Sequence, residues 1–256
     1  MKNINRYIVE KLKINKSKLK PGPECTLFPK SKVELVKIIK EEININGTEC
    51  SLNHIDVSQI VSMENLFSSL YSLEDFNGDI SYWDISNVKH MSGMFRESKF
   101  NNDSICNWDV SNIKTMNNMF EYSHFNKDIS MWDVSNVEDM SGMFRSSKFN
   151  QPLNDWDVSN VKYMAHMFHN NEFFNQPLND WDVSNVRDMA MMFEKSVFNQ
   201  PLDNWKVSKV NDMYFMFFSS KFNQDISMWK INNKCRTDKM LYDCPIEDKY
   251  RPICLQ

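Results

Sequence analysis

The stretch FNQPLNDWDVSNV occupies residues 149–161 and recurs letter for letter at residues 174–186. Its tryptophan belongs to a longer series, because neighbouring tryptophans are always 24 or 25 residues apart. The series is Trp83, Trp108, Trp132, Trp156, Trp181, Trp205 and Trp229. A fixed period of this length is typical of chains that stack one structural unit many times. The sequence therefore predicts a repeat array.

Apolar residues keep the same register in every unit. Valine or isoleucine stands two residues after each tryptophan, methionine eleven residues after it, and phenylalanine twelve, with Leu241 as the exception. One earlier unit has Ile55 in the place of the tryptophan. Eight units result, and the last one carries Lys234 and Thr237 where other units are apolar. Atypical ends are expected, since terminal units face water on one side.

Each unit is interpreted as a short strand followed by a short helix. Residues 153–158 (LNDWDV) have the apolar spacing of leucine-rich repeats. Residues 162–168 (KYMAHMF) place Met164, Met167 and Phe168 on one helical face. Neither element can bury its apolar face alone, so the coils should stack. The predicted fold is an α/β solenoid, a leucine-rich-repeat-like right-handed superhelix of about eight strand–turn–helix coils of 24–25 residues.

Four regions are predicted along the chain. They are a basic N-terminal arm at residues 1–20, an N-terminal cap at residues 21–51, the repeat solenoid at residues 52–244, and a C-terminal cap or tail at residues 245–256. In the first cap, residues 30–43 should form an amphipathic helix that closes the first coil through Val33, Val36, Ile39 and Ile43. The tail should fold over the last coil through Ile246, Tyr250 and Ile253.

Composition excludes several classes of function. A formal net charge of −4 gives no reason to expect binding of nucleic acid, which usually needs a basic face. No run approaches the roughly 18 apolar residues that a membrane span needs. The six cysteines show no C-x-x-C spacing, which predicts no zinc site. Their positions do not recur from unit to unit as a disulfide framework would, which predicts reduced thiols. The N-terminal residues lack a signal peptide, so a cytoplasmic or virion-associated protein is expected.

The repeat also has a family likeness. Residues 125–147 fit F-N-x-x-[IL]-x-x-W-D-V-S-N-V-x-x-M-x-x-M-F-x-x-S. This motif resembles the surface-protein repeat of mycoplasma and Listeria-type lipoproteins, a family related to BspA-like leucine-rich repeats. The resemblance covers residues 52–244 and implies a leucine-rich-repeat-like solenoid associated with surface display and protein binding. It carries over no catalytic residue, and this chain lacks the signal peptide and lipobox cysteine of exported members.

The recurring polar residues are interpreted as structural. An aspartate after the tryptophan, as at Asp157, could form an acidic stripe for a cation or basic partner, but stacked like charges repel. We expect it to accept hydrogen bonds from the Ser-Asn-Val turn of its own coil. A column of asparagines should satisfy backbone groups at the coil turns: Asn77, Asn101, Asn126, Asn150, Asn175, Asn199 and Asn223.

Binding residues are sought where the copies differ, because the shared positions build the scaffold. Tyr82, Met131 and Met228 stand just before a tryptophan. Met191 also falls outside the phase of the core methionines. Unit seven contains YFMFF, which adds Tyr214, Phe215 and Phe218 to the core residues. These extra aromatic residues either pack under the C-terminal tail or form an exposed apolar patch.

The predicted function is a non-enzymatic protein–protein interaction module. It would bind an unidentified protein through the variable strand face or the aromatic patch of unit seven, which could also mediate self-association. One alternative is a phage or other structural assembly component docked by residues 1–20. Another is a surface adhesin exported by a non-classical route. No cofactor and no catalytic motif are expected, and His166 and His169 lack the recurring companions of a metal site.

Overall fold

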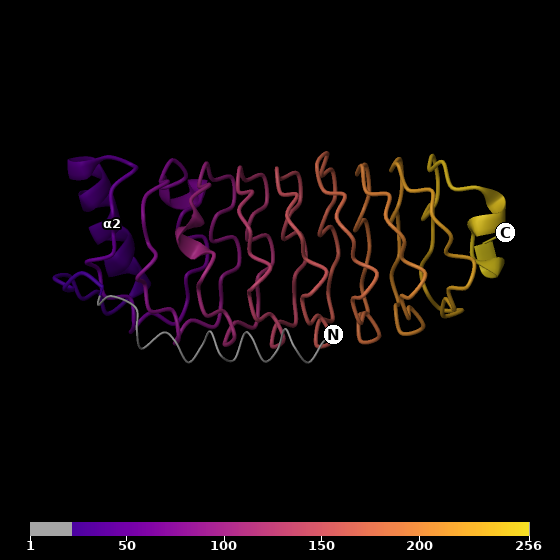
Figure 1. The fold of residues 1–256 in the computed structure, drawn as a ribbon, viewed down its shortest axis with the longest axis horizontal. Helices are drawn as coiled ribbons and strands as arrows, with labels where there is room; N and C mark the ends of the chain where they lie inside the picture. The colour runs from indigo at the N-terminus through magenta and orange to yellow at the C-terminus, as the bar shows by residue number, and fades with distance from the viewer. Residues whose placement is uncertain (1–21, 256) are drawn as a thin grey trace.

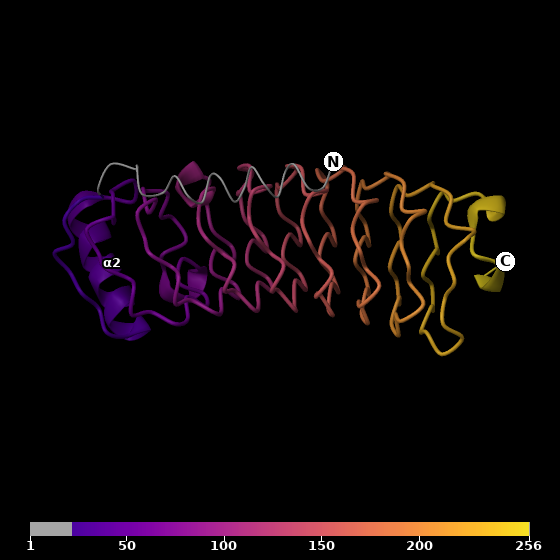
Figure 2. The same ribbon diagram turned by 60° about the horizontal axis from the view of Figure 1, so that its bottom comes forward.

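The computed structural model describes residues 22–255, which form an elongated stack of coils (Figure 1). The helix α2 (Lys32–Asn46) lies at one end of the stack, and the 3-10 helices η4 (Asp248–Tyr250) and η5 (Ile253–Leu255) lie at the other. Two further 3-10 helices are η2 (Ser69–Tyr71) and η3 (Asp103–Ile105). The turned view in Figure 2 shows the same stacking along the whole length. Each coil therefore has neighbours that are close in sequence.

Parallel bridges join the coils at one register position. They link residues seven positions after each tryptophan, in the order His90, Thr115, Asp139, Tyr163, Asp188, Asp212 and Arg236. The bridges are isolated, and in the described residues they do not extend into strands at residues 153–158. The line of coil-to-coil pairing thus runs just before the first methionine of each unit. The right-handed, leucine-rich-repeat-like coil stays a prediction.

The segment predicted as a short helix is a run of turns in the structure. Four N–H groups of the fifth coil donate to carbonyls of the sixth coil at 2.7–2.9 Å: those of Met164, His166, Phe168 and Asn170. The intervening N–H groups donate three residues back within their own coil at 3.1–3.2 Å: those of Met167, His169 and Asn171. An α-helix would direct every N–H four residues back. Here the neighbouring coil takes every second one, so no regular helix forms.

Aromatic columns fill the interior. Each tryptophan is buried, and its indole donates to a carbonyl of the preceding coil, as Trp156 Nε1 does to the Ile129 carbonyl at 3.1 Å. The phenylalanines stack from coil to coil, with ring centroids of Phe144 and Phe168 5.7 Å apart. Burial of large aromatic side chains contributes most to a core of this kind. The shared apolar residues are therefore used by the scaffold.

The asparagine column is a hydrogen-bonded ladder. The Asn150 N–H donates to Asn126 Oδ1 at 2.9 Å, and Asn150 Oδ1 accepts the Asn175 N–H at 3.1 Å. The ladder ends where the Glu247 N–H donates to Asn223 Oδ1 at 3.2 Å. These amides satisfy backbone donors that the stacking would otherwise leave unpaired.

The Asp-Val-Ser-Asn phrase closes each turn. Asp157 Oδ1 accepts the Ser159 N–H at 3.1 Å, within the same coil. Asn160 Nδ2 donates to the Ser135 carbonyl of the preceding coil at 2.7 Å. Aspartate and asparagine side chains commonly cap turns in this way. The carboxylate after the tryptophan is thus occupied by its own turn.

The N-terminal cap differs in one residue from the prediction. Leu35, Val36 and Ile39 of α2 are buried against the core, but Val33 is 80% exposed, so its placement on the buried stripe was wrong. A helix turns about 100° per residue, which brings Leu35 and Ile39 to one face and leaves Val33 on another. The helix begins where Ser31 Oγ accepts the Glu34 N–H and ends at Gly47, with φ of 83°.

The C-terminal tail also covers the last coil, and one of its residues differs from the prediction. Ile246 is buried, and the Tyr250 carbonyl accepts the Ile226 N–H at 3.0 Å. Ile253 is 81% exposed, so the prediction that it packs inward was wrong. Leu255 contacts the core instead, since a 3-10 turn points residues two apart in different directions.

Candidate interaction surface

The tenth residue after each tryptophan, or after Ile55, has a left-handed backbone. Its φ lies between 53° and 64° in all eight coils. We call these residues the left-handed column: Asn65, Gly93, Asn118, Gly142, His166, Met191, Phe215 and Lys239. Glycine adopts this conformation freely and asparagine tolerates it, whereas other side chains are rarely found there. The column is fixed by the alternating hydrogen bonds between coils.

In coils one to four the column alternates asparagine and glycine. A Cβ on Gly93 would collide with the Asn65 side-chain oxygen, and a Cβ on Gly142 would collide with that of Asn118. Small residues here leave a polar hollow of about 290 Å³ on the first three coils, which Ser92 and Arg96 also line. This half of the column therefore uses the residue types that the backbone prefers.

In coils five to eight the column carries large side chains. His166, Met191 and Phe215 are half-buried, and Lys239 is exposed. A left-handed conformation costs a residue other than glycine or asparagine roughly 1–2 kcal/mol. The backbone therefore does not explain the choice of histidine, methionine or phenylalanine at these positions.

Four rings gather around the seventh coil, and we call them the aromatic cluster. Ring centroids are 4.2 Å apart for Tyr214 and Phe215, 4.4 Å for Phe215 and Phe218, and 5.6 Å for Phe218 and Tyr242. The first three rings are half-buried, and Tyr242 is 61% exposed. The prediction for unit seven left two arrangements open, packing under the C-terminal tail or exposure. The ring contacts show that the cluster pairs with the eighth coil and stays partly exposed.

Two cations lie over these rings. The Arg236 guanidinium is 3.7 Å from the Tyr214 centroid and also pairs with Asp212 and Asp238 at 3.7 Å and 3.4 Å. The Lys239 ammonium is 5.5 Å from the Phe215 centroid and 5.8 Å from that of Tyr242. The surface is thus both aromatic and cationic.

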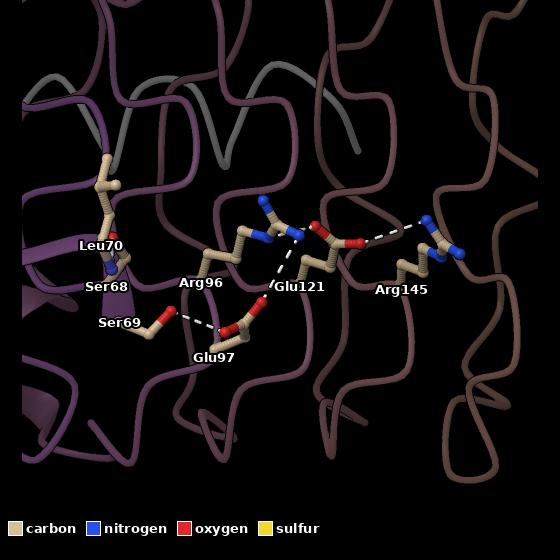
Figure 3. A network of polar contacts seen from close by, with 7 residues as sticks. All are labelled: Ser68, Ser69, Leu70, Arg96, Glu97, Glu121 and Arg145. Carbon is tan, nitrogen blue, oxygen red and sulfur yellow. Dashed lines mark hydrogen bonds and ion pairs between the residues drawn. The ribbon is translucent and has the colours of Figure 1, made fainter.

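A column of alternating charge links coils two to four (Figure 3). Glu121 is 3% exposed, and its two oxygens pair with Arg96 Nε at 2.8 Å and Arg145 at 3.2 Å. Each of these residues stands thirteen positions after its tryptophan. A buried carboxylate needs such partners, because an unpaired buried charge is strongly unfavourable. The column therefore holds neighbouring coils in register.

The same charged column continues through two titratable groups. His169 Nδ1 lies 3.0 Å from Glu194 Oε2. Burial lowers the pKa of His169 to about 4, and Arg145, His166 and Lys195 act in the same direction. Burial raises the pKa of Glu194 and lowers that of His166. His169 is thus neutral at pH 7, and a proton added there would be a buried charge.

The remaining predicted binding residues lie elsewhere. Tyr82, Met131 and Met228 are 51%, 53% and 78% exposed and belong to coils two, four and eight. The Tyr82 ring lies against Gly22. In the described residues none of them takes part in a ring contact with the aromatic cluster. Only Tyr214, Phe215 and Phe218 are therefore brought together.

Neither the left-handed column nor the charged column was predicted from the sequence. Glycine and asparagine alternate at the repeat spacing in coils one to four, which could have revealed the first. Arg96, Glu121 and Arg145 alternate in sign at the same spacing, which could have revealed the second. Within residues 22–255 no group of three or more His, Cys, Asp or Glu side chains could hold a metal ion. All six cysteines lie in this range and are free.

A family model supports the repeat organisation. The family described as "Mycoplasma protein of unknown function, DUF285" matches residues 37–152, 96–197 and 145–249, which together span most of the chain. The chain belongs to this family. The mycoplasma-type part of the predicted resemblance is thereby confirmed, while kinship of DUF285 with BspA-like repeats stays a prediction.

Other comparisons found nothing similar to this DUF285 chain: no curated protein and no solved structure matches it. In the part of the chain that the structure describes, no helix has the length and apolar character needed to cross a membrane.

Proposed function

We propose that this DUF285 chain is a non-enzymatic scaffold that binds another protein. The proposed binding surface is the left-handed column of coils five to eight together with the aromatic cluster. The shared residues of the repeat support this assignment, because their side chains bond within a coil or to the neighbouring coil. Tryptophan indoles, asparagine amides and the aspartates of the turns all bond within the stack. The variable residues are therefore the ones available to contact a partner.

One observation carries the proposal. Met191 and Phe215 occupy left-handed positions where Asn118 and Gly142 serve in other coils. Backbone strain tends to persist at functional sites. Large, partly exposed apolar side chains that lie side by side commonly mark interfaces. Together these features favour a binding role for the C-terminal half of the column.

A paired substitution tests the proposal. Met191→Asn with Phe215→Gly copies the Asn118–Gly142 pair into coils six and seven, and we call it the Asn–Gly variant. In affinity purification from the cells that produce the protein, we expect partners of the full chain to be lost with this variant. The matched control is Met131→Ser with Met228→Ser, which removes two more exposed methionines and should keep the partners.

Retention of every partner by the Asn–Gly variant would contradict the proposal. Loss of partners only in the control would move the binding surface to the position before the tryptophans. Circular dichroism should show the same spectrum for all three proteins, because none of the substitutions removes a residue of the buried columns.

The alternative functions predicted from the sequence remain predictions. Docking by residues 1–20 falls outside the described residues. Export as a surface adhesin, and the cytoplasmic or virion-associated location, concern the cell rather than the fold. Deletion of residues 1–20 should leave partner binding unchanged if the surface proposed here is the one in use.

A further inference from the structure

Lys239 is the cation of the surface that lacks an anion. Its ammonium lies over the Phe215 and Tyr242 rings, and among the described residues it forms no ion pair. Arg236 differs, because Asp212 and Asp238 both pair with it. A lysine ammonium over rings still has room for a carboxylate on its open side.

The acidic side chains around the aromatic cluster are engaged within the chain. Asp212 and Asp238 pair with Arg236, and Asp243 Oδ2 accepts the Ser219 hydroxyl at 2.9 Å. Glu194 is 7% exposed and pairs with Lys195 at 4.0 Å. Of these carboxylates, Asp212 and Asp238 share the Arg236 guanidinium, whereas Lys239 has no ion pair among the described residues, so an anionic partner has a cation available to it.

Apolar side chains adjoin this cation. Phe215 precedes Lys239 in the left-handed column and Met191 precedes Phe215, so the three stand in consecutive coils. Neighbouring coils bond to one another through the N–H groups of Met191 and Phe215 at 2.8 Å and 3.2 Å. The surface thus offers a methionine, a phenylalanine and an ammonium in a row, with Phe218 alongside.

We propose that this surface binds a protein segment that carries an aspartate or glutamate next to a large apolar side chain. The inference rests on the proposed function and names the chemistry of its partner. The apolar side chain contacts Met191 and Phe215, and the carboxylate pairs with Lys239. Apolar contact supplies most of the affinity at such surfaces, and the charge pair supplies selectivity.

A random peptide display library tests the partner chemistry directly. The library is selected on the full chain, on Lys239→Glu and on the Asn–Gly variant, with Lys239→Met as the matched neutral control. The full chain should enrich peptides with an acidic residue beside an aromatic or aliphatic one. Lys239→Glu should enrich Lys or Arg in place of the acidic residue, and the Asn–Gly variant should enrich neither.

The enriched acidic peptide is then synthesised and its affinity measured by calorimetry. We expect binding to weaken about tenfold or more on Lys239→Glu and less on Lys239→Met. Equal affinity for all three proteins would overturn the inference. So would enrichment of basic peptides on the full chain, which would show that the rings take a cation.

Two further outcomes separate this inference from the proposed function. Some peptides could still bind the Asn–Gly variant but no longer bind the control with Met131→Ser and Met228→Ser. That result would overturn both the proposed surface and its proposed partner. Absence of any enriched peptide would overturn the acidic-segment inference. Partner loss in affinity purification by the Asn–Gly variant would then still support the proposed function.

Discussion

Coils one to four and coils five to eight share one backbone conformation and differ in the side chains that they carry in the left-handed column. The left-handed column has nearly the same φ in Gly142 and Phe215, at 64° and 56°. The hydrogen bonds between coils set that conformation, whichever side chain is present. Asparagine and glycine suit it in the first half, and large residues strain it in the second. Left-handed residues of other types also occur in the first half, as at Glu97 and Tyr122. The difference between the halves therefore belongs to this column, and it shows where the repeat gives up the residue types that the column's backbone favours.

The largest effect should come from the columns that both halves share. Trp156→Ala removes a buried indole and one of the two donors to the Ile129 carbonyl, which keeps the Trp132 N–H. Truncation of a core tryptophan typically costs about 3–5 kcal/mol. We expect a loss of this size in the free energy of unfolding measured by urea denaturation. Met131→Ala, which truncates an exposed side chain, is the control, and an equal loss in both variants would contradict a tryptophan-based core.

A residue moved from the second half into the first should also destabilise the chain. Gly142→Phe puts the side chain of coil seven into coil four, where a Cβ would collide with Asn118. The left-handed backbone adds roughly 1–2 kcal/mol to that collision. We expect a total loss of about 2 kcal/mol or more in urea denaturation.

Ser141→Tyr is the matched control for Gly142→Phe. It copies Tyr214 of coil seven at the position just before the left-handed column, where the backbone is not left-handed. The control should be close to the unmodified protein. If Gly142→Phe is tolerated equally well, the two halves of the column do not differ in the way described.

The charged column predicts a smaller, pH-dependent effect. The folded pKa of His169, about 4, lies below its usual value of about 6.5. Between these values the unfolded chain binds the proton more readily, so this contribution is complete above pH 6.5 and is lost as the pH falls towards 4. His166 acts in the same direction, and the raised pKa of Glu194 opposes them.

His169→Asn should therefore reduce the loss of stability between pH 7 and pH 5, by on the order of 1 kcal/mol after allowance for solvent screening. Urea denaturation of both proteins at the two pH values gives the comparison. An unchanged pH dependence would show that His169 does not titrate as a buried group.

The sequence was sufficient for the period and for the inward-facing columns. Each tryptophan, methionine and phenylalanine of the motif recurs at one spacing, and stacking turns a spacing into a column. Family membership follows from the same motif. The amphipathic character of residues 30–43 also corresponds to α2, apart from Val33.

The sequence was not sufficient for the backbone inside each coil. Residues 162–168 have helical spacing, but the N–H groups of Met164, His166 and Phe168 bond to the next coil. That choice depends on a neighbour 24 or 25 residues away, which local propensity does not describe. The aromatic cluster needed the structure for the same reason, since Tyr242 and Lys239 join it from the eighth coil.

The most direct test of the account is the free energy of unfolding of the Asn–Gly variant. Met191→Asn and Phe215→Gly give up half-buried apolar contacts but relieve two left-handed residues. The two effects are of similar size, so urea denaturation should give a value within about 1 kcal/mol of the unmodified chain. A loss approaching the roughly 3–5 kcal/mol of a core phenylalanine would show that these residues fold the protein. That result would contradict their assignment to a binding surface.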